Sequence, residues 1–195
     1  LCCSHSRAGP EGQLPKVTEF LNDLARSVGF LGRLPVPSRF FVGHDGSLSR
    51  AVRAFPSAGL VIATPPALLL ALLLHLDADP LLSSLVALAV LTVLTGALHE
   101  DGLADAADGF GGGRDREHIL SIMKDSRNGS YGVIALILSF ALRAAALSAL
   151  AGPAASLPAF ALVASAALSR ALMVGHWHAL PAARSNGVAA GAGRP

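Results

Sequence analysis

Long apolar stretches with almost no polar interruption dominate this chain. Four of them have the length of about 20 residues that a helix needs to cross a hydrocarbon core roughly 30 Å thick. They run from about 57 to 76, 80 to 98, 131 to 151 and 155 to 177. Because these runs lack the polar stripe of a soluble core helix, the pattern predicts an all-α, multi-pass transmembrane helix bundle with about four spanning helices.

An amphipathic stretch precedes the first run. Between Val17 and Leu31, apolar residues recur at helical spacing with Glu19, Asp23 and Arg26 among them. This pattern predicts a helix that lies at the membrane interface and ends before two prolines. We therefore expect a flexible N-terminal segment at 1–16, one membrane-embedded domain at 17–177 with a loop at 99–130, and a low-complexity tail at 178–195.

Composition narrows the classes of protein that this pattern allows. Hydrophobic residues make up 52% of the chain and charged residues 14%, against roughly 25% charged in an ordinary soluble domain. That balance excludes a disordered chain, and a net charge of +2 is too small to favour nucleic acid as a partner. The only cysteines, Cys2 and Cys3, are adjacent, so a disulfide-stapled domain is excluded as well.

The basic residues predict how the spans are oriented. Seven of the fifteen Lys and Arg residues lie in 1–53 and four in 114–127, whereas the link at 77–80 has none. By the positive-inside rule, the N-terminal region and the loop 99–130 face the cytoplasm. Arg170 is expected at a helix end near the cytoplasm, and Trp177 as an interfacial anchor.

One basic residue interrupts the third apolar run. Arg143 lies about 18 Å deep if that helix begins near Tyr131. An arginine inside a span suggests either a functional site with a carboxylate partner or packing within the bundle.

The loop between the second and third runs concentrates the candidate chemistry. Seven of the thirteen acidic residues lie between Glu100 and Asp125. If the second helix continues past the membrane, Asp101, Asp105 and Asp108 share one face at positions i, i+4 and i+7. Three carboxylates on one face repel one another, and Mg²⁺, which prefers oxygen ligands, would relieve that repulsion. The plainer alternative is a solvated acidic helix end.

Glycines follow the acidic face at once. Gly109 and the triplet Gly111, Gly112 and Gly113 would let backbone N–H groups approach a phosphate closely. A mobile linker is the alternative for the triplet. Together with the carboxylates, the glycines favour a site for a metal ion and a phosphate.

Cationic side chains come next in the chain, after a short helix predicted at 115–124. Lys124 and Arg127 supply cations for phosphate oxygens, although ordinary anchoring at the cytoplasmic surface would explain them too. Asp125 would either complete the metal shell or pair with Lys124.

These motifs resemble those of the cobalamin synthase family, the adenosylcobinamide-GDP ribazoletransferases. Three segments carry the resemblance: Arg33-Leu34-Pro35-Val36-Pro37, then His99 to Gly109 with the glycine triplet, then Met123 to Gly132. The resemblance implies a multi-pass protein of the bacterial inner membrane that uses Mg²⁺ in the last assembly step of cobalamin. Such enzymes join ribazole, or its 5′-phosphate, to adenosylcobinamide-GDP and release GMP.

Taken with the residue patterns, the resemblance assigns roles within the loop. The expected metal ligands are Asp101, Asp105 and Asp108. The expected substrate-binding residues are Gly109, Gly111, Gly112, Gly113, Lys124, Ser126 and Arg127. The expected catalytic residues are His99, Glu100 and Asp105, and either His99 or Glu100 would accept the proton of an attacking hydroxyl group.

The resemblance also sets an expectation about the length of this chain. Family members continue with further apolar segments, so a C-terminally truncated chain is expected, whose small residues at 164–167 lack helix partners.

The leading alternative function is a divalent-cation transporter or membrane scaffold with an acidic ion mouth, and a soluble nucleotide-hydrolysing domain is third. A transporter predicts carboxylates within the spans, and the four runs contain none. A homo-oligomer is left open.

Overall fold

All regular secondary structure in the described part of the chain is helical. The computed structural model describes residues 16–41, 48–152, 154 and 156–184. The α-helices are α1 Lys16–Leu31, α2 Phe55–His75, α3 Pro80–Thr95, α4 Leu98–Gly112, α5 Arg116–Ile122, α6 Ser130–Leu150 and α7 Ser156–Ala179, with 3₁₀ helices η1 Ser38–Phe41 and η2 Ala51–Ala54. The all-α prediction is confirmed. Most of the predicted flexible segment and of the predicted tail lies outside the described residues.

Three helical stretches are long and apolar enough to cross a membrane, and one bent pair of helices passes the same test when its two members are taken together. The three are Ala51–His75, Ser130–Leu150 and Ser156–Ala179. The helices α3 and α4 pass the same test only together, and they meet at an angle of 92°. The apolar member of this pair is α3, because α4 carries four carboxylates. With three to four candidate spans, the predicted multi-pass helix bundle is confirmed.

The bend between α3 and α4 interrupts the second apolar run, which was predicted to form one span from about 80 to 98. Gly96 and Ala97 both adopt left-handed backbone angles, with φ of 62° and 60°, which no continuous α-helix contains. The side chain of Arg33 lies against Gly96, where a Cβ atom would collide with it. The Arg33 N–H also donates to the Leu94 carbonyl at 2.7 Å. Arg33, the first residue of the Arg33–Pro37 motif, thus packs at this corner.

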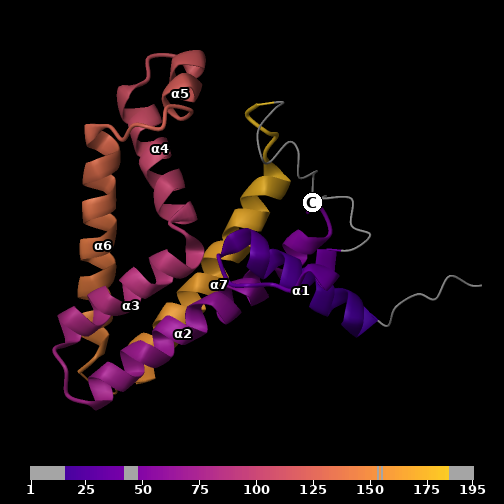
Figure 1. The fold of residues 1–195 in the computed structure, drawn as a ribbon. Helices are drawn as coiled ribbons and strands as arrows, with labels where there is room; N and C mark the ends of the chain where they lie inside the picture. The colour runs from indigo at the N-terminus through magenta and orange to yellow at the C-terminus, as the bar shows by residue number, and fades with distance from the viewer. Residues whose placement is uncertain (1–15, 42–47, 153, 155, 185–195) are drawn as a thin grey trace, which may run out of the picture.

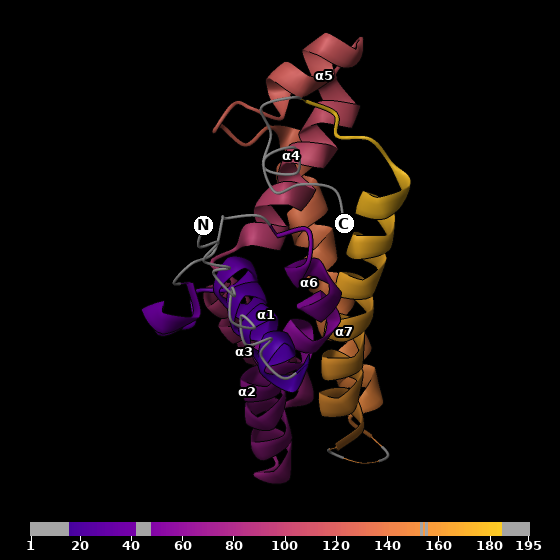
Figure 2. The same ribbon diagram turned by 90° about the vertical axis from the view of Figure 1, so that its right-hand side faces the viewer.

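The bundle is connected by α3, as Figures 1 and 2 show: α2 packs along α7, α3 contacts both α2 and α6, and α4 contacts α6. Gly59 of α2 lies so close to α7 that an added Cβ would be 2.7 Å from the Ala166 carbonyl oxygen. Small residues allow such close approach of membrane helices. The prediction that the face at 164–167 lacks partners is wrong for Ala166, which is buried against α2.

Aromatic residues fill one part of the α2–α7 interface. Phe55 is fully buried, and its ring lies 5.8 Å from Phe30 and 6.5 Å from Trp177. Trp177 packs against the cluster of buried core residues. The tryptophan is therefore part of the packing between helices, and its role as an interfacial anchor stays a prediction.

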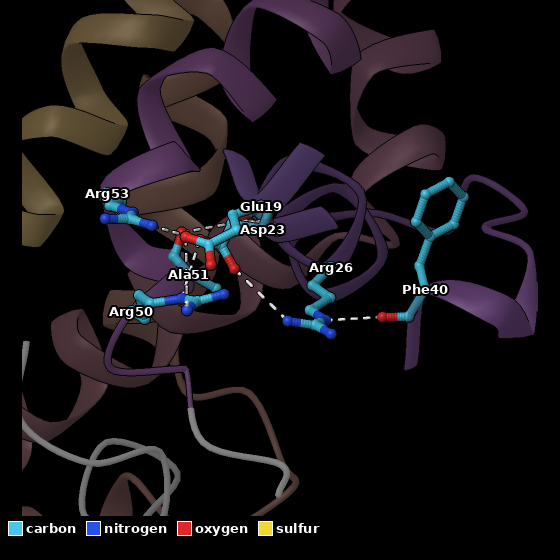
Figure 3. A network of polar contacts seen from close by, with 8 residues as sticks. Glu19, Asp23, Arg26, Phe40, Arg50, Ala51 and Arg53 are labelled. Carbon is cyan, nitrogen blue, oxygen red and sulfur yellow. Dashed lines mark hydrogen bonds and ion pairs between the residues drawn. The ribbon is translucent and has the colours of Figure 1, made fainter. Parts of the chain in front are cut away.

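Helix α1 is attached to the rest of the protein by ion pairs around one buried carboxylate (Figure 3). Asp23 is 0% exposed and contacts the guanidinium groups of Arg53 at 2.9 Å, Arg50 at 3.4 Å and Arg26 at 3.5 Å. The Ser27 hydroxyl donates to the Ala51 carbonyl at 2.9 Å. The polar side of α1 therefore faces the protein, while Val17 and Leu21 are exposed. That arrangement leaves apolar side chains on the outside, as the predicted interfacial helix requires.

Candidate functional site at helix α4

The third aspartate of the predicted metal face binds the beginning of α6. The two carboxylate oxygens of Asp108 accept hydrogen bonds from the backbone N–H groups of Gly129 at 2.7 Å and Gly132 at 2.8 Å. Asp108 is 8% exposed. The first N–H groups of a helix have no partner within the helix, and Asp108 supplies one from a neighbouring helix. Its expected role as a metal ligand stays a prediction, with both oxygens already engaged.

The alternative of a mobile linker for the glycine triplet is wrong, because Gly111 and Gly112, like Gly109, belong to the last turns of α4 and Gly113 caps it. An added Cβ would lie 2.7 Å from Met123 at Gly109 and 2.5 Å from the Tyr131 ring at Gly111. The glycines therefore allow close packing of α4 against the segment 123–132. Substrate binding by Gly109, Gly111, Gly112 and Gly113 stays a prediction.

The other two aspartates lie on the accessible side of α4. Asp101 is exposed and Asp105 is partly exposed. Partial burial raises the pKa of Asp105, and the negative charges of Asp101 and Asp108 raise it further. Within the described residues, no group of three or more His, Cys, Asp and Glu side chains is close enough to hold a metal ion. Mg²⁺ is usually bound by one or two protein carboxylates together with substrate phosphates and water, so Asp101 and Asp105 fit that ion as a pair.

The predicted cationic residues lie on the surface between α5 and α6. Lys124 and Ser126 are exposed, and so is the Arg127 side chain. The Arg127 guanidinium donates to Asp125 at 2.6 Å and lowers the pKa of that carboxyl group. Of the two alternatives for Asp125, pairing with Lys124 is thus replaced by pairing with Arg127.

The short helix α5 is held over the end of α4 by contacts that the sequence did not indicate. It begins where the Asp115 carboxylate accepts the His118 N–H at 2.8 Å. The Arg116 guanidinium donates to the Ala183 carbonyl at 2.8 Å, and the Arg184 guanidinium donates to the Leu120 carbonyl. The chain that follows α7 therefore fixes α5 in place, and the predicted helix at 115–124 is confirmed within a few residues.

His99 and Glu100 face away from the accessible aspartates. Both residues line a cavity of about 590 Å³ between α3, α4, α6 and α7. Successive residues of an α-helix are about 100° apart, so Asp101 and Asp105 lie on roughly the opposite side of α4. The structure therefore does not bring His99 or Glu100 together with the proposed metal pair. Their expected role as proton acceptors stays a prediction, against this geometry.

Two arginines share the cavity with these residues. The Arg143 guanidinium donates to Glu100 Oε1 at 3.3 Å, which is the carboxylate partner that an intramembrane arginine requires. Arg170 also lines the cavity and is 7% exposed. It precedes the end of α7 at Ala179 by nine residues, so its prediction as a helix-end residue is wrong. In the sequence, the only sign that Arg170 lies within the helix is its position inside a long apolar run.

Comparison with known proteins identifies the family. The model of the family described as cobalamin-5-phosphate synthase matches residues 23–194. The chain belongs to this family. It is 57% identical over 189 residues to an adenosylcobinamide-GDP ribazoletransferase of Sinorhizobium medicae, covering 93% of this chain and 70% of that protein.

Two further relatives of this cobalamin-5-phosphate synthase family member carry the same name. The one from Rhizobium etli strain CIAT 652 is 59% identical over 181 residues, covering 92% of this chain and 70% of its own length. The one from Brucella anthropi is 44% identical over 176 residues, covering 90% and 68%. No solved structure matches the chain.

Proposed function

We propose that the protein is an adenosylcobinamide-GDP ribazoletransferase, which joins ribazole or its 5′-phosphate to adenosylcobinamide-GDP and releases GMP. The supporting relatives cover at least nine-tenths of the chain and carry this name. The structural observation behind the proposal is the contact between the two loop motifs. Asp108 binds the backbone of Gly129 and Gly132, so the acidic side of α4 lies beside the segment that contains Lys124 and Arg127.

The acidic side of α4 fits one half of a phosphoryl-transfer site. Asp101 and Asp105 would hold Mg²⁺. Partial burial is the main cause of the raised pKa of Asp105, and the negative charges of Asp101 and Asp108, which a divalent cation would offset, raise it further. When bound, the ion would neutralise phosphate charge as GMP leaves. Lys124 and Arg127, with the hydroxyl of Ser126, would bind the same phosphates from the neighbouring loop.

The proposed transfer exchanges one phosphorus–oxygen bond for another. A hydroxyl oxygen of the ribazole acceptor attacks the phosphorus attached to cobinamide, and the bond from that phosphorus to the bridging oxygen breaks. GMP leaves with the bridging oxygen. Because His99 and Glu100 lie across the helix and Asp101 and Asp105 would be occupied by the metal ion, the hydroxyl proton passes to solvent water on the accessible side of α4 in this proposal.

The proposed orientation puts this site at the cytoplasmic surface of the inner membrane. One end of the molecule holds the C-terminal end of α4, the whole of α5 and the beginning of α6 (Figures 1 and 2). Four basic residues lie between Arg114 and Arg127, whereas the link 77–80 at the other end of α2 has none. A cation transporter is disfavoured, because α2, α3, α6 and α7 contain no Asp or Glu.

The test is release of GMP by the purified protein in lipid vesicles supplied with adenosylcobinamide-GDP, ribazole and Mg²⁺. Asp105→Asn should abolish release, and chelation of Mg²⁺ should do the same to the wild type. Asp77→Asn, the same change at an exposed position in the link between α2 and α3, is the matched control and should retain activity. Full activity of Asp105→Asn would contradict the proposed metal pair, and GMP release in chelator would contradict the metal.

A further inference from the structure

The cavity between α3, α4, α6 and α7 has one charged end and one apolar end. His99, Glu100, Arg143 and Arg170 lie at the charged end, and Leu150 and Ala161 lie at the other. Arg170 and Ala161 are nine positions apart in α7, which corresponds to about 14 Å along the helix. The volume of about 590 Å³ is in the range of small-molecule sites.

The charged end has polar atoms that the protein leaves without partners. Within the part of the chain that the structure describes, His99 Nε2, Glu100 Oε2 and Arg170 Nε are buried and make no hydrogen bond. Arg170 is more than nine-tenths buried, and its remaining bonds are to the Ser169 hydroxyl at 3.1 Å and the Ala166 carbonyl at 3.4 Å. A buried polar group without a partner costs free energy, so a ligand that supplies one would be stabilised here.

The charges at this end of the cavity determine which charge the ligand must carry. Two guanidinium groups, those of Arg143 and Arg170, face the single carboxylate of Glu100. Glu100 is paired with Arg143 at 3.3 Å and also attracts the charge of Arg170, so two positive charges share one carboxylate and this end of the cavity has a net positive charge. A buried cation is stable only when an anion accompanies it. The ligand therefore has an acidic group.

The surroundings select the rest of the ligand. Three walls of the cavity belong to α3, α6 and α7, which are apolar helices. The charged end lies toward α4 and the apolar end lies further along the spans. Basic pockets between membrane helices near the cytoplasmic side are typical sites for acidic lipid headgroups. We propose that this cavity binds an anionic phospholipid, with its phosphate at Arg170 and Arg143 and an acyl chain along α6 and α7.

Lipid retention tests this proposal without using the transfer reaction. The protein is reconstituted in nanodiscs of phosphatidylcholine with one-fifth phosphatidylglycerol, extracted into mild detergent, and analysed by native mass spectrometry. The wild type should keep one phosphatidylglycerol per chain in preference to phosphatidylcholine. Arg170→Gln should lower that preference by about fivefold, as expected for the loss of one basic contact. Equal retention of the two lipids by the wild type would overturn the proposal.

A second variant guards against misfolding of Arg170→Gln. Ala161→Phe keeps every charge and fills the apolar end of the cavity, so it should also release the lipid. The matched controls are Arg114→Gln, which removes an exposed charge, and Ala164→Phe, which enlarges an exposed residue of α7 outside the cavity lining. Both controls should keep the lipid, and circular dichroism should show equal helix content in all four variants. Retention by both Arg170→Gln and Ala161→Phe would overturn the site.

A soluble competitor distinguishes the lipid from a substrate. Ribazole 5′-phosphate also combines an apolar ring system with an acidic group. If one molecule of it replaced each bound phosphatidylglycerol in the wild type, the cavity would be the site of the ribazole acceptor and the lipid proposal would fail. If lipid retention depends on Arg170 and the phosphate does not compete, the lipid site stands, whatever the outcome of the GMP-release experiment.

Discussion

The carboxylate of Asp108 in α4 accepts a hydrogen bond from the backbone N–H of Gly132 in α6 at 2.8 Å. Its second oxygen accepts the N–H of Gly129 at 2.7 Å. One side chain therefore joins the two motifs of the loop and satisfies the beginning of a spanning helix. This relationship gives the third aspartate of the acidic motif a structural role that is separate from metal binding.

Removal of that carboxylate should destabilise the fold even without metal. Asp108→Ala leaves two N–H groups at the start of α6 without partners, and the free energy of unfolding should fall by about 1–3 kcal/mol. Thermal unfolding in detergent and chelator measures this change. Asp101→Ala, at an exposed position of the same helix, should change it by no more than about 0.5 kcal/mol. Equal effects of the two variants would mean that Asp108 has no special contact with α6.

Two glycines of the loop motifs should respond to alanine in opposite directions. A Cβ at Gly132 would collide with the Asp108 carboxylate and lie 3.0 Å from the Ala104 carbonyl oxygen, so Gly132→Ala should destabilise the protein by about 1–3 kcal/mol. A Cβ at Gly102 would meet nothing within 4 Å. Because alanine favours a helix interior, Gly102→Ala should stabilise α4 by about 0.5–1 kcal/mol. Unfolding midpoints of the two variants give the comparison, and a shift of the same sign in both would contradict it.

The Glu100–Arg143 pair should show a measurable coupling energy. The two side chains are 13% and 37% exposed, so solvent screens the pair only in part. In a double-mutant cycle with Glu100→Gln and Arg143→Gln, the coupling should be about 1 kcal/mol, and the double variant should unfold at a higher temperature than additive losses predict. A coupling of zero would show that α4 and α6 are not joined by this pair.

The Asp125 carboxyl group should titrate below the ordinary value of 3.8, because Arg127 donates to its charged form and lowers its pKa. A lowered pKa in the folded state means that the pair contributes stability above 3.8, which is lost as the pH falls through the lowered value. Carbon NMR of the labelled side chain in micelles measures this titration. Arg127→Gln should raise the midpoint, whereas Lys124→Gln should leave it unchanged. The reverse pattern would assign the pairing to Lys124.

The sequence alone determined the membrane-spanning architecture and the residues that carry the family resemblance. Uninterrupted apolar runs set the number and approximate bounds of the spanning helices, because span length and hydropathy are properties of consecutive residues. The spacing of Asp101 and Asp105 likewise follows from helix geometry, since one turn separates them.

Only the tertiary structure decided how those residues divide among different roles. The two left-handed residues at the corner before α4 turned that helix by 92° from α3. That turn placed Asp108 against α6, and it placed His99 and Glu100 in a cavity with Arg143 and Arg170. These partners are 21 to 71 positions away in the chain. Local periodicity shows which residues share a helix face, but contacts between helices depend on packing that no short segment contains.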